Sequence, residues 1–266
     1  RDLQHGRDVA IKIPFGAVAK KGTQGSLAQF RREILTHGKL VHPGIVTLFD
    51  ASPFLQELRE ARSAHAALPT DADVLIVEEL VEGGKTLLHL IQEGGWGMSV
   101  GQKLHFFAAL CDAVQFAHAA GILHVDLKPE NIFVQGRGGS EKPKLGDWGV
   151  ACDVAEAKRR VEQGEIFGTP IYFSPELTQL YPADPQADLY ALGAILYYFL
   201  TGRHYLDLDK ATSWEQLVDQ ICTRQSSSLC EGHPEITLEV ERIVFTALAK
   251  SREERYKTVA EFAAEP

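Results

Sequence analysis

The eight residues from 124 to 131, His-Val-Asp-Leu-Lys-Pro-Glu-Asn, constrain this chain more than any other segment. They follow a predicted helix that stops at Gly121, and they precede a short β-branched run at 132–134 that predicts a strand. A carboxylate, an ammonium group and an amide therefore fall within one loop whose two ends are fixed by regular elements. Loops held in this way often carry binding and catalytic residues, so this segment predicts a functional site.

The order of predicted elements is a small β-rich part followed by a larger helical part. Residues 8–14 are rich in β-branched side chains and end in proline, which favours a strand. Further strands are predicted near 45–49 and 74–80. Between the first two strands, Ser26 and Gln29 form a capping box that predicts the start of a helix.

A polar, alanine-rich stretch at 52–73 is longer than a usual connection between strands. We interpret it as a solvated insertion, in preference to a partner contact. From Leu87 onward, helical spacing dominates the sequence. Helices are predicted at 101–120, 188–200, 213–221 and 238–250, with a last one that begins at Thr258.

Composition and charge exclude several classes of protein. The chain has 266 residues and a formal net charge of −9, which argues against a general nucleic-acid or membrane-surface binder. Its four cysteines form no C-x-x-C pair, which favours reduced thiols in a cytoplasmic domain. The longest apolar run, residues 189–200, is shorter than the roughly 20 residues that span a bilayer, so it predicts a buried helix. Because the first residue is Arg1, we expect a piece of a longer protein, in which a membrane anchor elsewhere has room.

Further motifs accompany the loop at 124–131. They are Val9-Ala10-Ile11-Lys12 in a predicted strand, Glu33 in a predicted helix, Asp147-Trp148-Gly149, and Ser174-Pro175-Glu176. In this order and on these elements, they resemble the protein kinase family over nearly the whole chain. The run Ala-Lys-Ser-Arg-Glu-Glu-Arg-Tyr at 249–256 and the segment at 77–84 resemble bacterial kinases of the eukaryotic type in particular. The resemblance implies an α+β, two-lobed kinase fold. Residues 1–81 would form a small, incomplete β-rich N-lobe, and residues 82–266 a larger helical C-lobe.

The resemblance implies a protein serine/threonine kinase that uses ATP with Mg²⁺ or Mn²⁺. Asp126 is then the base that accepts the proton of the substrate hydroxyl, and Lys128 contacts the migrating phosphoryl group. Asn131 and Asp147 are the implied metal ligands, since Mg²⁺ prefers oxygen donors. The implied partner is a protein that bears serine or threonine, and no nucleic acid.

Lys12 is implied to hold the α- and β-phosphates and to pair with Glu33. Glu78 falls at the gatekeeper position, where a carboxylate could compete with Glu33 for the lysine. The remaining residues implied to bind ATP are Ala10 and Phe133 on the two sides of adenine, Glu79 and Val81 through their backbone, Glu82 at the ribose, and Glu130 in the catalytic loop with Lys128, Asn131 and Asp147.

Three further residues are implied to hold the substrate-binding segment, which contains Gly168-Thr169-Pro170 and Ser174-Pro175-Glu176, and the loop at 124–131. Thr169 would bridge the base and the lysine two residues after it. Glu176 would pair with Arg255. Asp188 would accept hydrogen bonds from the backbone of the catalytic loop.

The chain departs from the family pattern before Lys12, because no G-x-G-x-x-G precedes that residue. We interpret the chain as a fragment that begins after the glycine-rich loop. The alternative is a naturally lidless pseudokinase or a scaffold with a kinase fold. A kinase of small molecules is a weaker third reading, because Thr169 and Ser174-Pro175-Glu176 indicate a protein substrate.

A second departure concerns activation. Val125 stands where many kinases have an arginine that binds a phosphorylated loop, and residues 147–168 contain no serine, threonine or tyrosine. The two substitutions agree, and they predict that phosphorylation of this loop does not switch the enzyme on. The basic run at 158–160 is interpreted as a solvated charge cluster, in preference to a phosphate or substrate contact.

Overall fold

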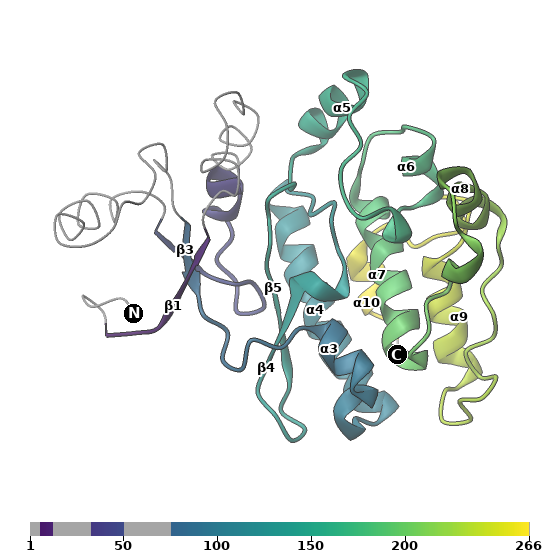
Figure 1. Ribbon diagram of the computed structural model, residues 1–266, viewed down its shortest axis with the longest axis horizontal. Coiled ribbons are helices and arrows are strands. Elements are labelled where there is room, and N and C mark those ends of the chain that lie inside the picture. Colours follow the sequence, from purple (N-terminus) through teal and green to yellow (C-terminus); the bar gives the residue numbers. More distant parts are fainter. Residues whose placement is uncertain (1–5, 13–32, 51–75, 266) are drawn as a thin grey trace.

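The computed structural model describes residues 6–12, 33–50 and 76–265. Three antiparallel strands form a small sheet in the order β1-β3-β2 (Figure 1). Their bounds are Val9–Lys12 for β1, Leu48–Asp50 for β2 and Ile76–Glu79 for β3. Each strand overlaps a predicted one, and β-branched residues occupy β1 and β3, whereas those of the predicted strand at 45–49 lie just before β2.

Part of what the sequence predicts in this region falls outside the described residues. That holds for the capping box at Ser26 and Gln29 and for the insertion at 52–73. Residues 33–37 are helical. Glu33 and His37 therefore lie one turn apart and face the same side.

The larger part of the molecule is helical, with one two-stranded sheet between it and the three-stranded sheet (Figure 1). The hairpin pairs β4, Ile132–Gln135, with β5, Lys142–Leu145. The helices are α3, Leu87–Gln92; α4, Val100–Ala119; α5, Val154–Glu162; α6, Pro175–Thr178; α7, Pro185–Thr201; α8, Trp214–Thr223; α9, Leu238–Ala247; and α10, Val259–Ala263.

Local sequence signals explain where these helices begin and end. Ser99 caps α4 by accepting a hydrogen bond from the backbone N–H of Gln102, and the Gln102 side chain accepts one from Ser99. Thr258 caps α10 in the way that its sequence predicts. At the C-terminal end of α7, Gly202 adopts φ 70°, a left-handed conformation that favours glycine.

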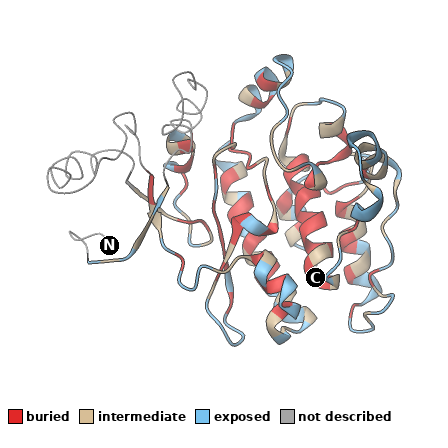
Figure 2. Ribbon diagram, viewed as in Figure 1, coloured by how far each residue is buried: buried red, intermediate tan, exposed pale blue. Residues whose placement is uncertain are grey.

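The core of the helical part is built around α7, which is buried along most of its length (Figure 2). A helix that is apolar on all sides is stable only inside a core, so the run at 189–200 is a buried helix, as predicted. Helices α4, α9 and α10 pack against it. Across the described ranges, we find no helix with the length and apolar character needed to cross a membrane. All four cysteines are free thiols.

A short segment joins the two parts. The backbone of Gly44 and Val46 exchanges hydrogen bonds with Leu145 of β5, at 2.8 and 2.9 Å. Ile45, which lies between them, is fully buried in the core of the helical part. The chain therefore has the predicted α+β, two-lobed architecture, with residues from both parts meeting at the end of β1.

Candidate active site

The side chain of Lys12 reaches from β1 to two carboxylates. Its Nζ lies 2.5 Å from Glu33 Oε1 and 2.6 Å from Asp147 Oδ1. The pairing of Lys12 with Glu33 that the sequence predicts is therefore confirmed. Burial acts against the charged ammonium, but the attraction of Asp147 and Glu33 outweighs it and raises the pKa of Lys12 above its ordinary value. The lysine is thus a fixed positive charge at the mouth of the site.

The two carboxylates respond to this lysine differently. Burial raises the pKa of Glu33, and the attraction of Lys12 offsets this only in part. Burial also acts to raise the pKa of Asp147, but Lys12 outweighs it, so the pKa of Asp147 is lowered. Asp147 is therefore the carboxylate that stays ionised most readily, which suits a metal ligand.

The loop at 124–131, the predicted catalytic loop, takes part with Thr169 in one network of predicted groups. Lys128 Nζ donates to Asp126 Oδ2 at 2.6 Å and to Thr169 Oγ1 at 2.9 Å. The Thr169 hydroxyl donates to Asp126 Oδ1 at 2.6 Å. The predicted bridge of Thr169 between Asp126 and Lys128 is therefore present.

Asp188 holds this loop in a strained backbone conformation. Its two carboxylate oxygens accept the backbone N–H groups of His124 and Val125, each at 2.9 Å. Val125 has φ 68°, which is rare for a β-branched residue and costs about 1–3 kcal/mol. His118 Nε2 lies 2.8 Å from Asp188 Oδ2. Burial acts to raise the pKa of Asp188, but the hydrogen bonds and the nearby histidines outweigh it and lower that pKa.

The two residues predicted to bind a metal are joined through the backbone. Asn131 Nδ2 donates to the backbone oxygen of Asp126 at 2.9 Å, so the oxygen of the same amide is the atom suited to a metal. Gly146, just before Asp147, donates its N–H to the backbone oxygen of Asn131 at 2.9 Å. One carboxylate oxygen of Asp147 meets Lys12, and the other, which has no hydrogen bond to the described residues, would be suited to a cation. This donor set fits Mg²⁺, which commonly takes one or two protein oxygens plus phosphate oxygens.

The residues predicted around adenine lie along β3, the segment after it, and β4. In the β1–β3 pair, Ala10 is opposite Glu78. Val81 is buried and Glu82 is exposed. Phe133 of β4 packs so closely on the backbone that a Cβ at Gly146 would lie 2.9 Å from its ring.

Two of the residues predicted to bind ATP take positions that limit their roles. The Glu79 carboxylate accepts hydrogen bonds from Lys144 at 2.6 Å and from Thr47 at 3.1 Å. The role predicted for Glu79 therefore rests on its backbone alone. Glu130 lies in a short 3-10 turn, and its side chain is exposed.

Glu78 and Trp148 both lie beside His37, which is on the same helix as Glu33. Glu78 Oε1 lies 3.4 Å from His37 Nδ1, whereas the hydrogen-bond partners of Lys12 among the described residues are Glu33 and Asp147. The Trp148 side chain is fully buried, and its ring lies 4.6 Å from that of His124 and 6.2 Å from that of His37.

Comparison with known proteins decides which family these features belong to. The family model for the protein kinase domain matches residues 1–265. The chain belongs to the protein kinase family. A probable serine/threonine-protein kinase of Corynebacterium efficiens is 34% identical over 267 aligned residues, which cover 99% of this chain and 37% of that protein. The serine/threonine-protein kinases PknB of Mycobacterium leprae and Mycobacterium tuberculosis are 31% and 32% identical, and their matches cover 100% of this chain and 39% of each relative. The kinase domain thus spans about two-fifths of the length of these relatives.

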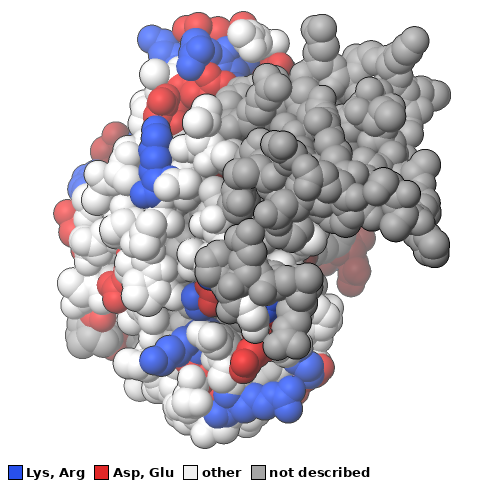
Figure 3. Space-filling view, turned by 90° about the vertical axis from the view of Figure 1, so that its left-hand side faces the viewer, with Lys and Arg blue, Asp and Glu red and all other residues white. Residues whose placement is uncertain are grey.

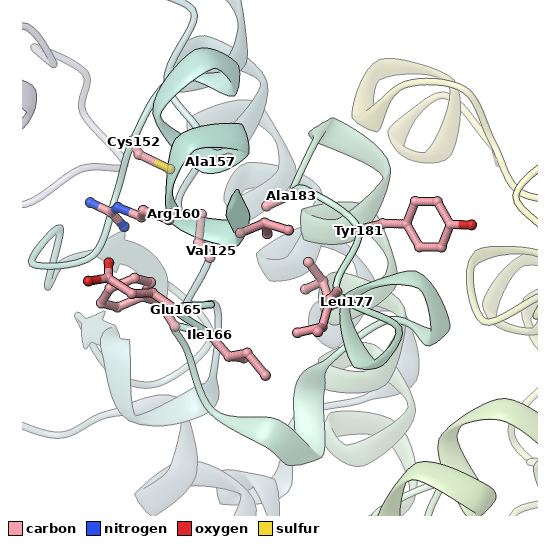
Figure 4. A pocket seen from close by; sticks show the side chains of 12 residues that line it. Val125, Cys152, Ala157, Arg160, Glu165, Ile166, Leu177, Tyr181 and Ala183 are labelled. Atoms are coloured by element: carbon pink, nitrogen blue, oxygen red, sulfur yellow. The ribbon is translucent and has the colours of Figure 1, made fainter. Parts of the chain in front are cut away.

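Residues 147–168, the activation segment of this kinase domain, contain a helix, α5, that the sequence did not lead us to predict. Asp153 caps it by accepting the N–H of Glu156 at 2.7 Å. Ala157 of α5 packs into a small apolar cluster next to Val125. Val125, Ala157 and Leu177 line one pocket between α5 and α6 (Figure 4). The valine that replaces the usual arginine therefore makes an apolar contact with the activation segment.

The prediction of a solvated basic run at 158–160 is wrong for Arg160. Lys158 and Arg159 are exposed, and Figure 3 shows basic and acidic side chains mixed at the end of the molecule where α5 lies. Arg160 is buried, because its Nη1 donates to the backbone oxygen of Val150 at 2.8 Å and its guanidinium lies 4.5 Å from the centre of the Phe167 ring. The buried guanidinium of Arg160 thus contacts both ends of the activation segment, at Val150 and at Phe167.

We expect Arg160→Ala to lower kcat for phosphorylation of a protein substrate about tenfold. Hydrogen bonds to charged groups contribute about 1.5–3 kcal/mol to the stability of the structure that they hold, so their loss should loosen the activation segment. The loss should be accompanied by faster proteolytic cleavage within 148–168. Arg159→Ala is the matched control, since Arg159 lies on the same helix and its side chain is 65% exposed. Equal behaviour of the two variants in both assays would contradict this role for Arg160.

The segment after Phe167 is anchored at two points. Gly168 has φ 104°, and a Cβ there would lie 2.7 Å from the backbone oxygen of Val125, so glycine is required. Further on, Glu176 and Arg255 form two parallel hydrogen bonds of 2.6 Å, which confirms the predicted pair. These contacts place Thr169 against the catalytic loop.

Several supporting residues were missed because their contacts are distant in sequence. His118, which lies in the predicted helix at 101–120, contacts Asp188, and His37 contacts Glu78. Lys144 donates a hydrogen bond to the carboxylate of Glu79 and holds that side chain in place. The only sequence signal for such residues is a polar side chain at a position where helical or strand periodicity predicts burial.

Proposed function

We propose that this kinase domain transfers the γ-phosphoryl group of ATP to a serine or threonine hydroxyl of a protein. The observation that carries the proposal is the network of Asp126, Lys128 and Thr169, because it directs a carboxylate and an ammonium group to one point. Asp126 would accept the proton of the attacking hydroxyl. Lys128 would stabilise the charge on the migrating phosphoryl oxygens, where phosphoryl transfer places most of its demand.

Lys12, held by Glu33, would contact the α- and β-phosphates. Asn131 and Asp147 would hold Mg²⁺, or Mn²⁺ in its place, which would neutralise phosphate charge and orient the γ-phosphoryl group. Ala10, Val81 and Phe133 would enclose adenine, with backbone groups of Glu79 and Val81 as hydrogen-bond partners and Glu82 at the ribose. Glu130 would contribute through its backbone, since its side chain is exposed.

The choice of serine or threonine rests on Thr169 and on the names of the relatives, which are serine/threonine-protein kinases. The intact Lys12–Glu33 contact favours an enzyme over the alternative of a pseudokinase or scaffold. The division at residues 81 and 82, a cytoplasmic location and the absence of nucleic-acid partners remain predictions from the sequence.

We further propose that this domain works without phosphorylation of its activation segment. Arg160 and the apolar cluster around Val125 and Ala157 occupy the structural role that a phosphorylated side chain serves in switched kinases. Mass spectrometry of the active protein tests this proposal. A stoichiometric phosphate within 148–168 whose removal abolishes activity would contradict it.

The test of the main proposal is transfer of labelled γ-phosphate from ATP to a generic basic protein, run with Mg²⁺ and with Mn²⁺. We expect label on serine and threonine after acid hydrolysis, and loss of transfer in Asp126→Ala. ATP binding without transfer in the parent protein would favour the pseudokinase. Transfer that requires no protein substrate and labels a small molecule would favour a different kinase class.

A further inference from the structure

The loop between α8 and α9 carries three consecutive serines at 226–228, which begin two residues after Arg224 (Figure 1). Ser227 and Ser228 are exposed, and Ser226 is partly buried. Within the described residues, the backbone N–H groups of 225–227 form no hydrogen bond, and no helix or strand includes them. A segment of this kind can enter the cleft of another protein without breaking regular structure, as exposed loops do when proteases cleave them.

Ser227 differs from the two serines beside it. The hydroxyl of Ser228 donates to Glu241 Oε2 at 2.5 Å, so it is already engaged. Ser226 lines a different hollow of the surface. The hydroxyl of Ser227 has no hydrogen bond to any described residue, but the backbone oxygen of Ser227 accepts from the Tyr197 hydroxyl at 3.2 Å. The loop is therefore held against α7, while the Ser227 hydroxyl stays open to modification.

Ser227 lines a polar cleft of about 730 Å³ together with the side chains of Arg203 and Arg224. The hydrogen bonds of Arg203 to described residues come from its backbone, which leaves its guanidinium group unpaired there. Arg224 Nη1 lies 3.7 Å from Asp207 Oδ2, and Asp207 also pairs with Lys210 at 2.9 Å. Both arginines therefore have donors in reserve, and the planar guanidinium group matches the geometry of phosphate.

The cations prevail over the carboxylates at the point where the loop meets α7. The Tyr197 hydroxyl, which donates to the loop there, is affected by both kinds of charge. Burial raises the pKa of Tyr197, and Glu241 and Glu231 act in the same direction. Arg224 and Arg203 act to lower that pKa, each more strongly than either glutamate acts to raise it. An anion added at this point would therefore be attracted.

We propose that Ser227 is a phosphorylation site, modified in trans by a second copy of this chain, and that Arg203 and Arg224 hold the resulting phosphate in the cleft. The inference rests on the proposed function, because it names a substrate for that activity. The Ser227 oxygen attacks the γ-phosphorus of ATP, and the bond from that phosphorus to the β–γ bridging oxygen breaks. ADP leaves, and Asp126 of the second copy accepts the hydroxyl proton.

The trans arrangement follows from how the two groups are held. Hydrogen bonds within the larger lobe fix both Ser227 and Asp126, so one copy does not bring its own serine to its own base. The phosphate adds about 1.5–2 negative charges and three acceptor oxygens. Arg203 directly follows the glycine that ends α7, so a phosphate held by both arginines fastens the α8–α9 loop to the end of α7.

Peptide mapping by mass spectrometry tests the site. After incubation with ATP and Mg²⁺, the parent should carry a stoichiometric phosphate at Ser227, and Ser227→Ala should lack it. Asp126→Ala should stay unmodified alone and gain the phosphate when an active copy of different mass is added. Ser140→Ala changes an exposed serine of the β4–β5 turn and should keep the phosphate at Ser227. A parent that labels a generic basic protein but leaves Ser227 unmodified overturns the inference.

A second measurement needs no catalysis by the domain. Phosphoserine is placed at position 227 during synthesis, and ³¹P NMR follows its second pKa, which is about 6 for an unperturbed phosphate. The arginines should lower this pKa by on the order of one unit relative to the same protein unfolded in urea. Arg203→Gln and Arg224→Gln should each reverse part of the shift, whereas Arg159→Gln on exposed α5 should not.

The two measurements separate the inference from the proposed function. A phosphate pKa that does not change on unfolding, or one that ignores both arginine substitutions, overturns the inference. A parent that transfers no phosphate to any acceptor contradicts the proposed function, and with it the trans step. The titration then decides by itself whether the cleft holds a phosphate.

Discussion

Replacing Asp126 with alanine should lower the rate of phosphoryl transfer by about 10²–10⁴-fold, the range typical of a lost general base. The two carboxylate oxygens of Asp126 meet Lys128 and Thr169 at 2.6 Å, so the side chain is already oriented before any substrate binds. Affinity for ATP should change little, because the phosphates are assigned to Lys12 and the metal ligands. The measurement is initial-rate kinetics with a protein substrate, beside ATP binding by calorimetry.

Asp126→Asn distinguishes a base from a residue that only holds its neighbours. An amide of the same shape can accept from Lys128 and contact Thr169, but it cannot take up the hydroxyl proton. We expect the asparagine variant to be nearly as inactive as the alanine variant. If Asp126→Asn keeps the rate of the parent, then Asp126 orients Lys128 and Thr169 and is not the base.

Replacing Arg255 with methionine should lower the free energy of unfolding by about 3–5 kcal/mol at neutral pH, the loss typical when a buried pair is broken from one side. The Arg255 side chain is fully buried and holds both oxygens of Glu176 at 2.6 Å. It also donates to the backbone oxygen of Ala249 at 2.7 Å. Denaturant unfolding of parent and variant measures the difference.

The pH dependence of this loss has a definite sign. Burial acts to raise the pKa of Glu176, but Arg255 outweighs it, so the folded-state pKa lies below the ordinary value of 4.5. A group with a depressed pKa stabilises the fold above its unfolded-state pKa and loses that contribution as the pH falls through the folded-state value. The gap between parent and Arg255→Met should therefore narrow as the pH falls below about 4.5.

Two further variants test whether the loss of stability in Arg255→Met comes from the buried pair. Arg252→Ala removes the partner of Asp184 nearby, but the Arg252 side chain is 37% exposed, so the loss should stay below about 1 kcal/mol. The double variant Glu176→Leu/Arg255→Met should lose less than Arg255→Met alone, because it leaves no uncompensated charge. An Arg255→Met protein as stable as the parent would show that the pair contributes little.

Sequence reasoning reached the catalytic loop because its chemistry is local. Asp126, Lys128 and Asn131 lie within six consecutive residues, and their spacing alone predicts a shared site. The strands and most helices followed from β-branched runs, helical periodicity and caps, whose causes act over a few residues. The pairing of Lys12 with Glu33 came from the family resemblance, and the geometry agrees with it.

Helix α5 was missed although its sequence carries a local signal, because Asp153 caps it, Glu156 follows at the third helical position, and Ala, Lys and Arg are strong helix formers. The other failures originate in tertiary contacts. The burial of Arg160 depends on a backbone oxygen and a ring elsewhere in the segment, which no local pattern reveals. His37 and Glu78 are separated by 41 positions, so their contact follows only from the folded arrangement.

The attachment of residues 44–46 to β5 has a mechanical consequence. Leu145 belongs to the larger lobe, and His37 donates to the oxygen of Val46, so the end of the helix that bears Glu33 is fastened to that lobe. The backbone of strand β1 pairs with β3, and the Lys12 side chain at its end meets Asp147 of the larger lobe at 2.6 Å. We expect the sheet to tilt about residues 44–46 as the two lobes move. The Lys12–Asp147 distance should then lengthen, because this contact joins the lobes away from that fixed point, so it reports the angle between them.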